Sequence, residues 1–244
     1  MGVGVCDPRS DPSILSPVIW LVHAYTASGA VLAYLALRAV AADDVRMAFA
    51  WLAVAMVVDA TDGWLARSAR VHARLPAFDG ARLDDIVDYL TFVFVPLYLI
   101  EYLGHLPRAV SGWVVAGALL ASAYGFARTD AKTSDHFFTG FPSYWNIVAL
   151  YVVALDTGRW LNAGILMGLT VLVFVRLKYV YPSRTEVLRL LTIILALLWG
   201  IAMVAIIWQL PRPSPALVVG SLLFPVYYVV LSVALHVRRA AGRI

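Results

Sequence analysis

The carboxylates of this chain are unevenly distributed. It has 244 residues and 15 Asp and Glu side chains, so a window of thirty residues should hold about two of them. Residues 59–88 hold six. Four of these form two pairs at helical spacing, Asp59 with Asp62 and Asp84 with Asp88. Because residues three or four apart share one face of a helix, two helix ends would present two pairs of carboxylates to one crevice.

The chemistry of such a crevice follows from its charge. Four carboxylates repel one another unless cations neutralise them. Mg²⁺ or Mn²⁺ fits better than Zn²⁺, because no Cys and no suitably spaced His accompanies the acids. Metals held in this way bind and polarise a phosphate or pyrophosphate. The sequence therefore predicts a metal site for phosphorus chemistry.

Small and basic residues accompany the acids. Gly63 leaves space where a phosphate or nucleotide can approach the backbone, and Ala66 and Gly80 allow two helices to pack closely. Arg67 can pair with a phosphate. Each of these residues alone has an ordinary explanation, since Gly is common in membrane helices and Arg commonly anchors their cytoplasmic ends. Their combination with four acids favours a functional site.

Other polar residues have simpler explanations. Asp79 and Asp85 fit neither pair, and we interpret them as a helix cap or an interfacial charge. Asp85 would point away from the Asp84–Asp88 face. His23 lies within an apolar segment with no second His or acid at ligand spacing, so we interpret it as a packing residue whose hydrogen bonds are satisfied.

The elements that must position these residues are membrane helices. Hydrophobic residues make up 62% of the chain, against about 45–50% in globular proteins. Between Arg189 and Arg212 lie 22 uncharged residues, enough for a helix to cross a hydrocarbon core about 30 Å thick. This composition excludes an ordinary soluble domain. Because backbone groups must be satisfied within the lipid and no strand alternation is present, we predict an all-α, polytopic helix bundle in which residues 1–244 form one domain.

Hydropathy also predicts the number and orientation of the helices. Charges and prolines delimit eight spans, at roughly 17–38, 47–66, 83–103, 109–127, 143–157, 161–180, 187–208 and 214–236. Eight spans divide the 19 Lys and Arg residues 14 to 5 between the two sides. The positive-inside rule then places both termini and the acid-rich segment in the cytoplasm. We attribute the net charge of +4 to loops that face anionic lipid, and exclude nucleic acid as a partner.

The acids and their neighbours resemble the signature of the CDP-alcohol phosphatidyltransferase family, D-x2-D-G-x2-A-R followed by G-x3-D-x3-D. All eight positions match: Asp59, Asp62, Gly63, Ala66, Arg67, Gly80, Asp84 and Asp88. The sequence departs from the common pattern in the gap between the two halves, where residues 68–79 make twelve residues instead of the eight of most members.

This longer gap looks like the bacterial phosphatidylcholine synthase branch, which joins choline directly to CDP-diacylglycerol. The predicted number of spans also resembles that of this branch, because it is eight, whereas the common family core has six. Two further stretches, FFTGFPSYWN and YVYPSRT, also resemble it. The resemblance runs from the motif to about residue 185.

The resemblance implies a reaction and roles for residues. Asp59, Asp62, Asp84 and Asp88 would hold Mn²⁺ or Mg²⁺, with Asp84 and Asp88 catalytic. Asp88 would take the proton from the choline hydroxyl, which attacks the phosphorus attached to diacylglycerol and expels CMP. The remaining motif positions would accommodate the nucleotide: Gly63, Ala66, Gly80 and Arg67. The enzyme would lie among the lipids of a bacterial inner membrane, with its active site facing the cytoplasm.

Choline recognition requires aromatic faces, because a quaternary ammonium cannot donate hydrogen bonds. The candidates in the two branch-like stretches are Phe141, Tyr144, Trp145 and Tyr181. An interfacial aromatic belt explains the same residues equally well.

Several alternatives stay open at this point. The acceptor could be glycerol 3-phosphate, serine or inositol phosphate, or the enzyme could transfer phosphocholine from CDP-choline to diacylglycerol. A transporter fits less well, because the acids sit at helix ends on one side and the other spans offer few polar residues to a path. A purely structural membrane protein is a third class. The sequence leaves open the preferred metal, the acyl-chain preference and whether the protein forms a homodimer.

Overall fold

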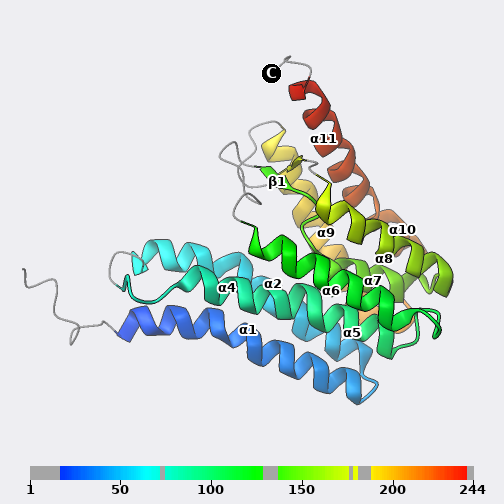
Figure 1. Ribbon diagram of the computed structural model, residues 1–244, viewed down its shortest axis with the longest axis horizontal. Helices are drawn as coiled ribbons and strands as arrows, with labels where there is room; N and C mark the ends of the chain where they lie inside the picture. The colour runs from blue at the N-terminus through cyan, green and yellow to red at the C-terminus, as the bar shows by residue number, and fades with distance from the viewer. Residues whose placement is uncertain (1–16, 72–74, 129–136, 176–177, 181–187, 241–244) are drawn as a thin grey trace, which may run out of the picture.

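The structure, a computed structural model, describes residues 17–71, 75–128, 137–175, 178–180 and 188–240 (Figure 1). Helices make up nearly all of this part of the chain. In order, its elements are α1 (Pro17–Ala41), α2 (Val45–Ser68), α4 (Gly80–Asp88), the π-helix η3 (Tyr89–Phe94), α5 (Val95–Tyr102), α6 (Ser111–Ala127), β1 (Phe137–Thr139), α7 (Trp145–Leu155), α8 (Arg159–Phe174), β2 (Lys178–Val180), α9 (Arg189–Gln209), α10 (Pro215–Ser221) and α11 (Leu223–Ala240).

The predicted all-α membrane bundle is confirmed. Seven of the eight predicted spans coincide with one helix or with consecutive helices, as 83–103 does with α4, η3 and α5. The prediction for 161–180 was too long, because α8 ends at Phe174 and residues 178–180 form strand β2. Within the described part of the chain, four segments are long and apolar enough to cross a membrane: Ile19–Ala41, Val45–Ser68, Arg189–Gln209 and Pro215–Leu235. Helices α6, α7 and α8 are apolar but shorter. The number of eight crossings and the cytoplasmic position of both termini stay predictions.

One small feature was not predicted. Strands β1 and β2 pair antiparallel, with Phe138 opposite Tyr179. Three-residue strands carry too short a pattern of alternation to be recognised in an apolar sequence. The pairing joins the segment that precedes α7 to the segment that follows α8.

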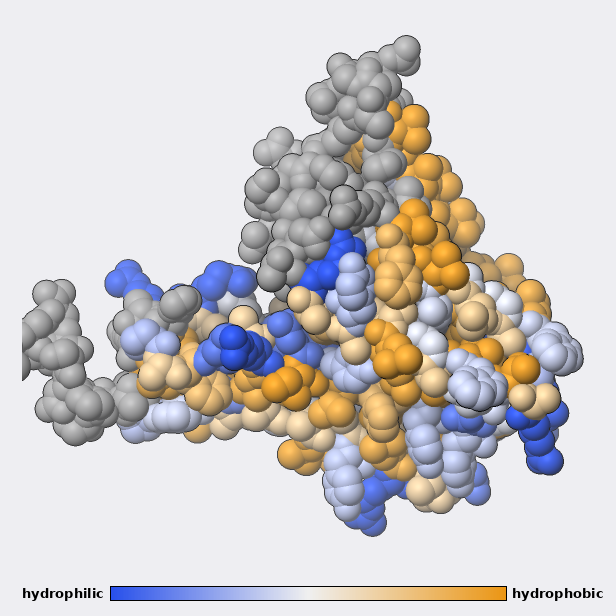
Figure 2. Space-filling view, viewed as in Figure 1, coloured by the Kyte–Doolittle hydropathy of each residue, from blue (hydrophilic) through white to orange (hydrophobic). Residues whose placement is uncertain are grey.

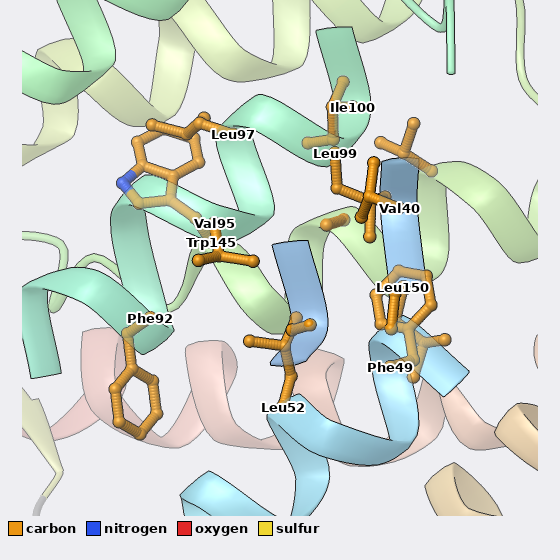
Figure 3. Close-up of a cluster of buried hydrophobic side chains, with 14 of the residues drawn as sticks. Val40, Phe49, Leu52, Phe92, Val95, Leu97, Leu99, Ile100, Trp145 and Leu150 are labelled. Carbon is orange, nitrogen blue, oxygen red and sulfur yellow. The ribbon is translucent and has the colours of Figure 1, made fainter. Parts of the chain in front are cut away.

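The first two helices form an antiparallel pair joined by a tight turn. The Asp44 side chain caps α2 by accepting a hydrogen bond of 3.0 Å from the Met47 backbone N–H. Small buried residues of α1, including Ala33, Ala36 and Ala39, leave room for the neighbouring helices to come close. The pair continues into the main buried cluster, where Val40, Phe49 and Leu52 lie near side chains of α5 and α7 (Figure 3).

The helix that follows α4 widens into a π-helix directly after Asp88. Pro96 lies at the start of α5 and lacks the N–H that an α-helix would pair with a carbonyl one turn earlier. A π-helical turn is one way to absorb such a disruption without ending the helix. The predicted continuous helix over 83–103 was therefore right in extent but not in its internal geometry.

The surface of the bundle suits a lipid environment. Large apolar side chains are exposed along α9, among them Leu190, Leu197, Ile201 and Val204. In water such a face would be an aggregation hazard, but it costs nothing in contact with lipid. Figure 2 shows hydrophobic residues over α11, whereas hydrophilic residues gather towards the ends of the helices, including the end where α4 begins.

Candidate active site

Three of the four predicted acids come together between α2 and α4. One carboxylate oxygen from each of Asp59, Asp84 and Asp88 lies within 4.8 Å of the others, and all three side chains are half-buried. Asp59 comes from α2, and Asp84 and Asp88 lie one helical turn apart on α4. The shared face that the spacing predicts is therefore present, and it faces the other helix of the motif.

The donor set fits a hard divalent cation. Mg²⁺ takes oxygen ligands at about 2.0–2.1 Å in octahedral geometry, so its ligand oxygens are about 3–4 Å apart. The spacing of the three carboxylates lies within about an ångström of that range. Asp59, Asp84 and Asp88 could thus hold Mg²⁺ or Mn²⁺ after small side-chain movements.

Asp62 has a different environment from the other three acids. Its side chain is buried, with 6% of its surface exposed, and it is not part of the three-carboxylate group. Its Oδ2 atom accepts a hydrogen bond of 2.8 Å from the hydroxyl of Thr26 on α1, which is itself buried. The fourth acid of the motif is thus held by α1.

The two acids that we set aside behave as expected. Asp79 caps α4 by accepting a hydrogen bond of 3.1 Å from the Arg82 backbone N–H, and it also forms an exposed ion pair with the Arg82 side chain. Asp85 is exposed. Their interpretation as a cap and a surface charge is confirmed.

Gly63 and Arg67 are neighbours on the surface of α2. A Cβ atom built at Gly63 would lie 3.1 Å from Nη1 of Arg67, so the arginine side chain folds back along the helix over the glycine. Arg67 is exposed and can reach a phosphate group outside the helix. Ala66 instead packs against a small buried cluster that contains Ile19, Val22, Val71 and Leu75.

Gly80 makes its close approach to α1, whereas the motif alone suggested an approach between α2 and α4. A Cβ atom at Gly80 would lie 2.9 Å from Cε1 of His23. The packing of α4 is likewise against α1 more than against α2. The space left by the missing side chain is therefore filled by His23.

The interpretation of His23 was right about packing and wrong about its hydrogen bonds. Its ring is buried against Phe78, with centroids 4.3 Å apart, and Trp20 lies at the edge of the same group. Its Nε2 atom has no hydrogen-bond partner among the described residues. The sequence could not show this, because the neighbours of His23 come from a distant segment.

Comparison with known proteins supplies the family. The chain is 38% identical over 220 residues to phosphatidylcholine synthase of Legionella pneumophila, covering 87% of this chain and 86% of that protein. It is 38% identical over 198 residues to phosphatidylcholine synthase of Pseudomonas aeruginosa, and the match covers 81% of this chain and 83% of that protein. It is 31% identical over 216 residues to phosphatidylcholine synthase of Borreliella burgdorferi, and the match covers 88% of this chain and 92% of that protein. No protein-family model matches the chain.

The chain belongs to the phosphatidylcholine synthase family. This membership confirms the resemblance that the motif and its longer gap indicated. The similarity is not confined to the motif, since the matches extend over most of the chain.

Two of the aromatic candidates in this phosphatidylcholine synthase-like chain are in contact, because the Phe141 ring packs edge to face against Trp145 with centroids 5.2 Å apart. Trp145 is 0% exposed, and its Nε1 donates a hydrogen bond of 2.7 Å to Ser122 Oγ in the core. Tyr144 is half-buried at the start of α7, with its ring centroid 6.0 Å from that of Phe92. Tyr181 lies outside the described residues. We therefore assign the Trp145 ring to packing and leave Tyr144 as a candidate contact.

The contribution of α1 to the site was missed. Thr26 and Gly29 lie three and six residues after His23, so the three residues follow one side of the helix. Thr26 contacts Asp62, and a Cβ atom at Gly29 would clash with the Val87 side chain of α4. A signal was available, because a polar residue within an apolar span commonly has a functional partner. The identity of that partner required the fold.

Proposed function

We propose that this protein is an integral membrane phosphatidylcholine synthase, which transfers the phosphatidyl group of CDP-diacylglycerol to choline and releases CMP. The observation that carries the chemistry is the convergence of Asp59 of α2 with Asp84 and Asp88 of α4. The choice of choline as acceptor rests on the family, whose members are named as phosphatidylcholine synthases.

The proposed cofactor is Mn²⁺ or Mg²⁺. Asp59, Asp84 and Asp88 would hold it, with Asp62 as a further ligand beside them. A bound divalent cation would neutralise the pyrophosphate and stabilise the phosphate that leaves with CMP. Without a cation, the three carboxylates would repel the negatively charged pyrophosphate. The group of acids can therefore bind this substrate only when a cation balances its charge.

The proposed reaction has two catalytic carboxylates. Asp88 accepts the proton of the choline hydroxyl, and the alcohol oxygen attacks the phosphorus that carries diacylglycerol. The bond from this phosphorus to the bridging oxygen breaks, and CMP takes the electron pair. Asp84, one turn before Asp88, keeps the reacting phosphate next to the base.

The nucleotide would lie over the neighbouring positions of the motif. Gly63 leaves space on one side of α2, and the exposed Arg67 presents its guanidinium over that glycine. A guanidinium can donate two parallel hydrogen bonds to a phosphate. Ala66 and Gly80 would act indirectly, because their small size lets α2 and α4 pack on the surrounding helices.

The proposed location is the bacterial inner membrane, with the active site at the cytoplasmic surface. The asymmetry of Lys and Arg supports this orientation. Acyl chains of CDP-diacylglycerol would remain among the membrane lipids, while choline would enter and CMP would leave through the cytoplasm. A homodimer is compatible with this arrangement but is not required by it.

The test is a reconstitution with defined substrates. Purified protein in detergent with Mn²⁺ and CDP-diacylglycerol should convert labelled choline into labelled phosphatidylcholine with one CMP released per lipid. Glycerol 3-phosphate, serine and inositol phosphate should give no lipid product. Production from CDP-choline and diacylglycerol, or from another acceptor, would overturn the proposal in favour of that reaction. A transporter would give no covalent product with any of these substrates.

A further inference from the structure

Helix α1 contacts both halves of the motif although it carries no motif residue. His23 packs against Gly80 of α4, Thr26 donates a hydrogen bond to Asp62 of α2, and Gly29 lies against Val87 of α4. Val87 directly precedes Asp88. One face of α1 therefore fixes the distance between the two helices that supply the carboxylates.

Thr26 stands out among the threonines of the described helices. The other four each donate their hydroxyl hydrogen to the backbone carbonyl four residues earlier, as is usual inside a helix: Thr61 to Val57, Thr91 to Val87, Thr170 to Leu166 and Thr192 to Leu188. Thr26 instead donates to the Asp62 carboxylate across the helix interface. A hydroxyl has a single hydrogen to donate, so this choice excludes the local bond.

Burial strengthens the hydrogen bond between the Thr26 hydroxyl and the Asp62 carboxylate. Thr26 and Asp62 are 7% and 6% exposed, so water has little access to either group. A buried carboxylate oxygen without a donor is costly, and a hydrogen bond to a charged group is stronger than one between neutral groups. The bond to Oδ2 therefore restricts rotation of the Asp62 side chain, which has only two rotatable bonds.

We propose that Thr26 is a positioning residue for Asp62, whose hydroxyl fixes the carboxylate so that it acts as the fourth ligand of the metal site. The proposal rests on the function proposed above, because it assumes that the acids bind a divalent cation. Without the hydroxyl, Asp62 would have to be oriented at the moment of metal binding, and affinity for the metal would fall.

The nearest polar contact between the same helices provides a matched control. The Tyr25 hydroxyl forms a hydrogen bond of 2.8 Å with Thr61 Oγ1, one residue before each member of the Thr26–Asp62 pair. Tyr25→Phe removes a hydroxyl from the α1–α2 interface without touching a motif residue. Thr26→Val removes the donor at nearly constant volume, and Thr26→Ser keeps it.

The experiment measures Mn²⁺ binding to the purified full chain in detergent, by the loss of the electron paramagnetic resonance signal of free Mn²⁺. Thr26→Val should weaken binding about tenfold, since the lost hydrogen bond involves a charged acceptor. Thr26→Ser and Tyr25→Phe should stay within about threefold of the parent protein. In an Asp62→Asn background, Thr26→Val should change binding no further.

The outcomes separate this proposal from the proposed function. Unchanged Mn²⁺ binding in Thr26→Val would overturn the positioning role, as would equal weakening in Tyr25→Phe, which would mean that any loss at the α1–α2 interface has the same effect. Absence of Mn²⁺ binding by the parent protein would overturn it as well. If the parent protein binds Mn²⁺ and Thr26→Val weakens that binding, but choline is not incorporated into lipid, then the proposed function fails and the role of Thr26 stands.

Discussion

The side chain of His23 occupies the space that any side chain at Gly80 would need. A Cβ atom at position 80 would lie 2.9 Å from Cε1 of His23, closer than carbon atoms pack in proteins. The contact joins the N-terminal part of α1 to the first residue of α4, the helix that carries Asp84 and Asp88. Glycine at this position of the motif is thus explained by helix packing in this structure.

Substitution of Gly80 by Ala should displace α4 and reduce turnover. We expect a loss of about 1–3 kcal/mol in stability, because overpacking at a buried contact forces side chains or backbone to shift. The thermal midpoint in detergent and the rate of CMP release would measure the two effects.

A second substitution tests the cause of this loss. In a His23→Ala background the clash is absent, so Gly80→Ala should cost less there than in the parent protein. Gly117→Ala on α6 is the control, since a Cβ atom at that position meets nothing within 4 Å. Equal losses from Gly80→Ala with and without His23 would show that the contact does not explain the glycine.

Replacing the catalytic carboxylates should abolish most activity without unfolding the protein. We expect Asp88→Asn to lower the turnover number by about a hundredfold to ten-thousandfold, the usual contribution of a general base. Asp84→Asn should also weaken Mn²⁺ binding, because it removes a proposed ligand. The control is Asp85→Asn, one residue away on the same helix but exposed, which should retain activity within about twofold. Comparable loss in all three variants would indicate a general effect of charge on α4.

Arg67 should contribute to binding of the nucleotide lipid more than to the chemical step. We expect Arg67→Gln to raise KM for CDP-diacylglycerol about tenfold, as for the loss of a hydrogen bond between charged groups, with a smaller change in kcat. Arg70→Gln alters another exposed arginine just beyond α2 and should leave KM nearly unchanged. A fall in kcat at constant KM would instead place Arg67 at the reacting phosphate.

Sequence spacing predicted a group of four carboxylates, and the structure brings three of them together. Asp84 and Asp88 are four residues apart on α4, and the structure places Asp59 of α2 beside them. The separate environment of Asp62 could not be predicted in the same way. It depends on a hydroxyl 36 residues earlier in the chain, and helical periodicity carries no information about which neighbour a face will meet.

Hydropathy likewise placed the helices but not their internal detail. The predicted span 143–157 corresponds to α7, which covers Trp145–Leu155. The π-helix after Asp88 and the pairing of β1 with β2 were not foreseen, because both depend on local geometry within apolar sequence. The burial of Trp145 could not be predicted either. The same sequence pattern is compatible with an aromatic residue at a helix start that faces a core, a lipid interface or a ligand.

The pH dependence of stability should contain a contribution from His105, in the loop between α5 and α6. Burial lowers the pKa of His105 below its ordinary value of 6.5; Asp156 raises it and Arg159 lowers it further. Because the pKa is lower in the folded state, the folded protein binds fewer protons between the two pKa values. The stabilisation is present above about pH 6.5 and is lost as the pH falls through the folded-state pKa.

Thermal midpoints between pH 8 and pH 5 would test this contribution. The parent protein should lose stability below about pH 6.5 more steeply than His105→Gln, which has no imidazole to titrate. His105 lies outside the membrane-spanning segments, so the proton is readily available from water. Identical pH profiles for the two proteins would show that His105 is not responsible.

Trp145 offers a direct test of whether a buried aromatic residue belongs to the choline site. Its side chain is 0% exposed and donates a hydrogen bond of 2.7 Å to Ser122 Oγ, which also accepts a hydrogen bond from Ser143. Trp145→Phe removes this donor and leaves a smaller ring, so we expect a loss of roughly 1–3 kcal/mol in stability. Choline binding should be unaffected, with KM for choline within about twofold of the parent value.

Tyr144 provides the comparison on the adjacent position, because it is half-buried beside Phe92 and has access to the surface. If Tyr144 contacts choline, Tyr144→Ala should raise KM for choline several-fold, since a cation–π contact at a partly exposed site is worth about 0.5–1 kcal/mol. A larger rise in KM from Trp145→Phe than from Tyr144→Ala would reverse the assignment. It would mean that the core around Ser122 opens in the substrate complex and that the Trp145 ring then faces the quaternary ammonium.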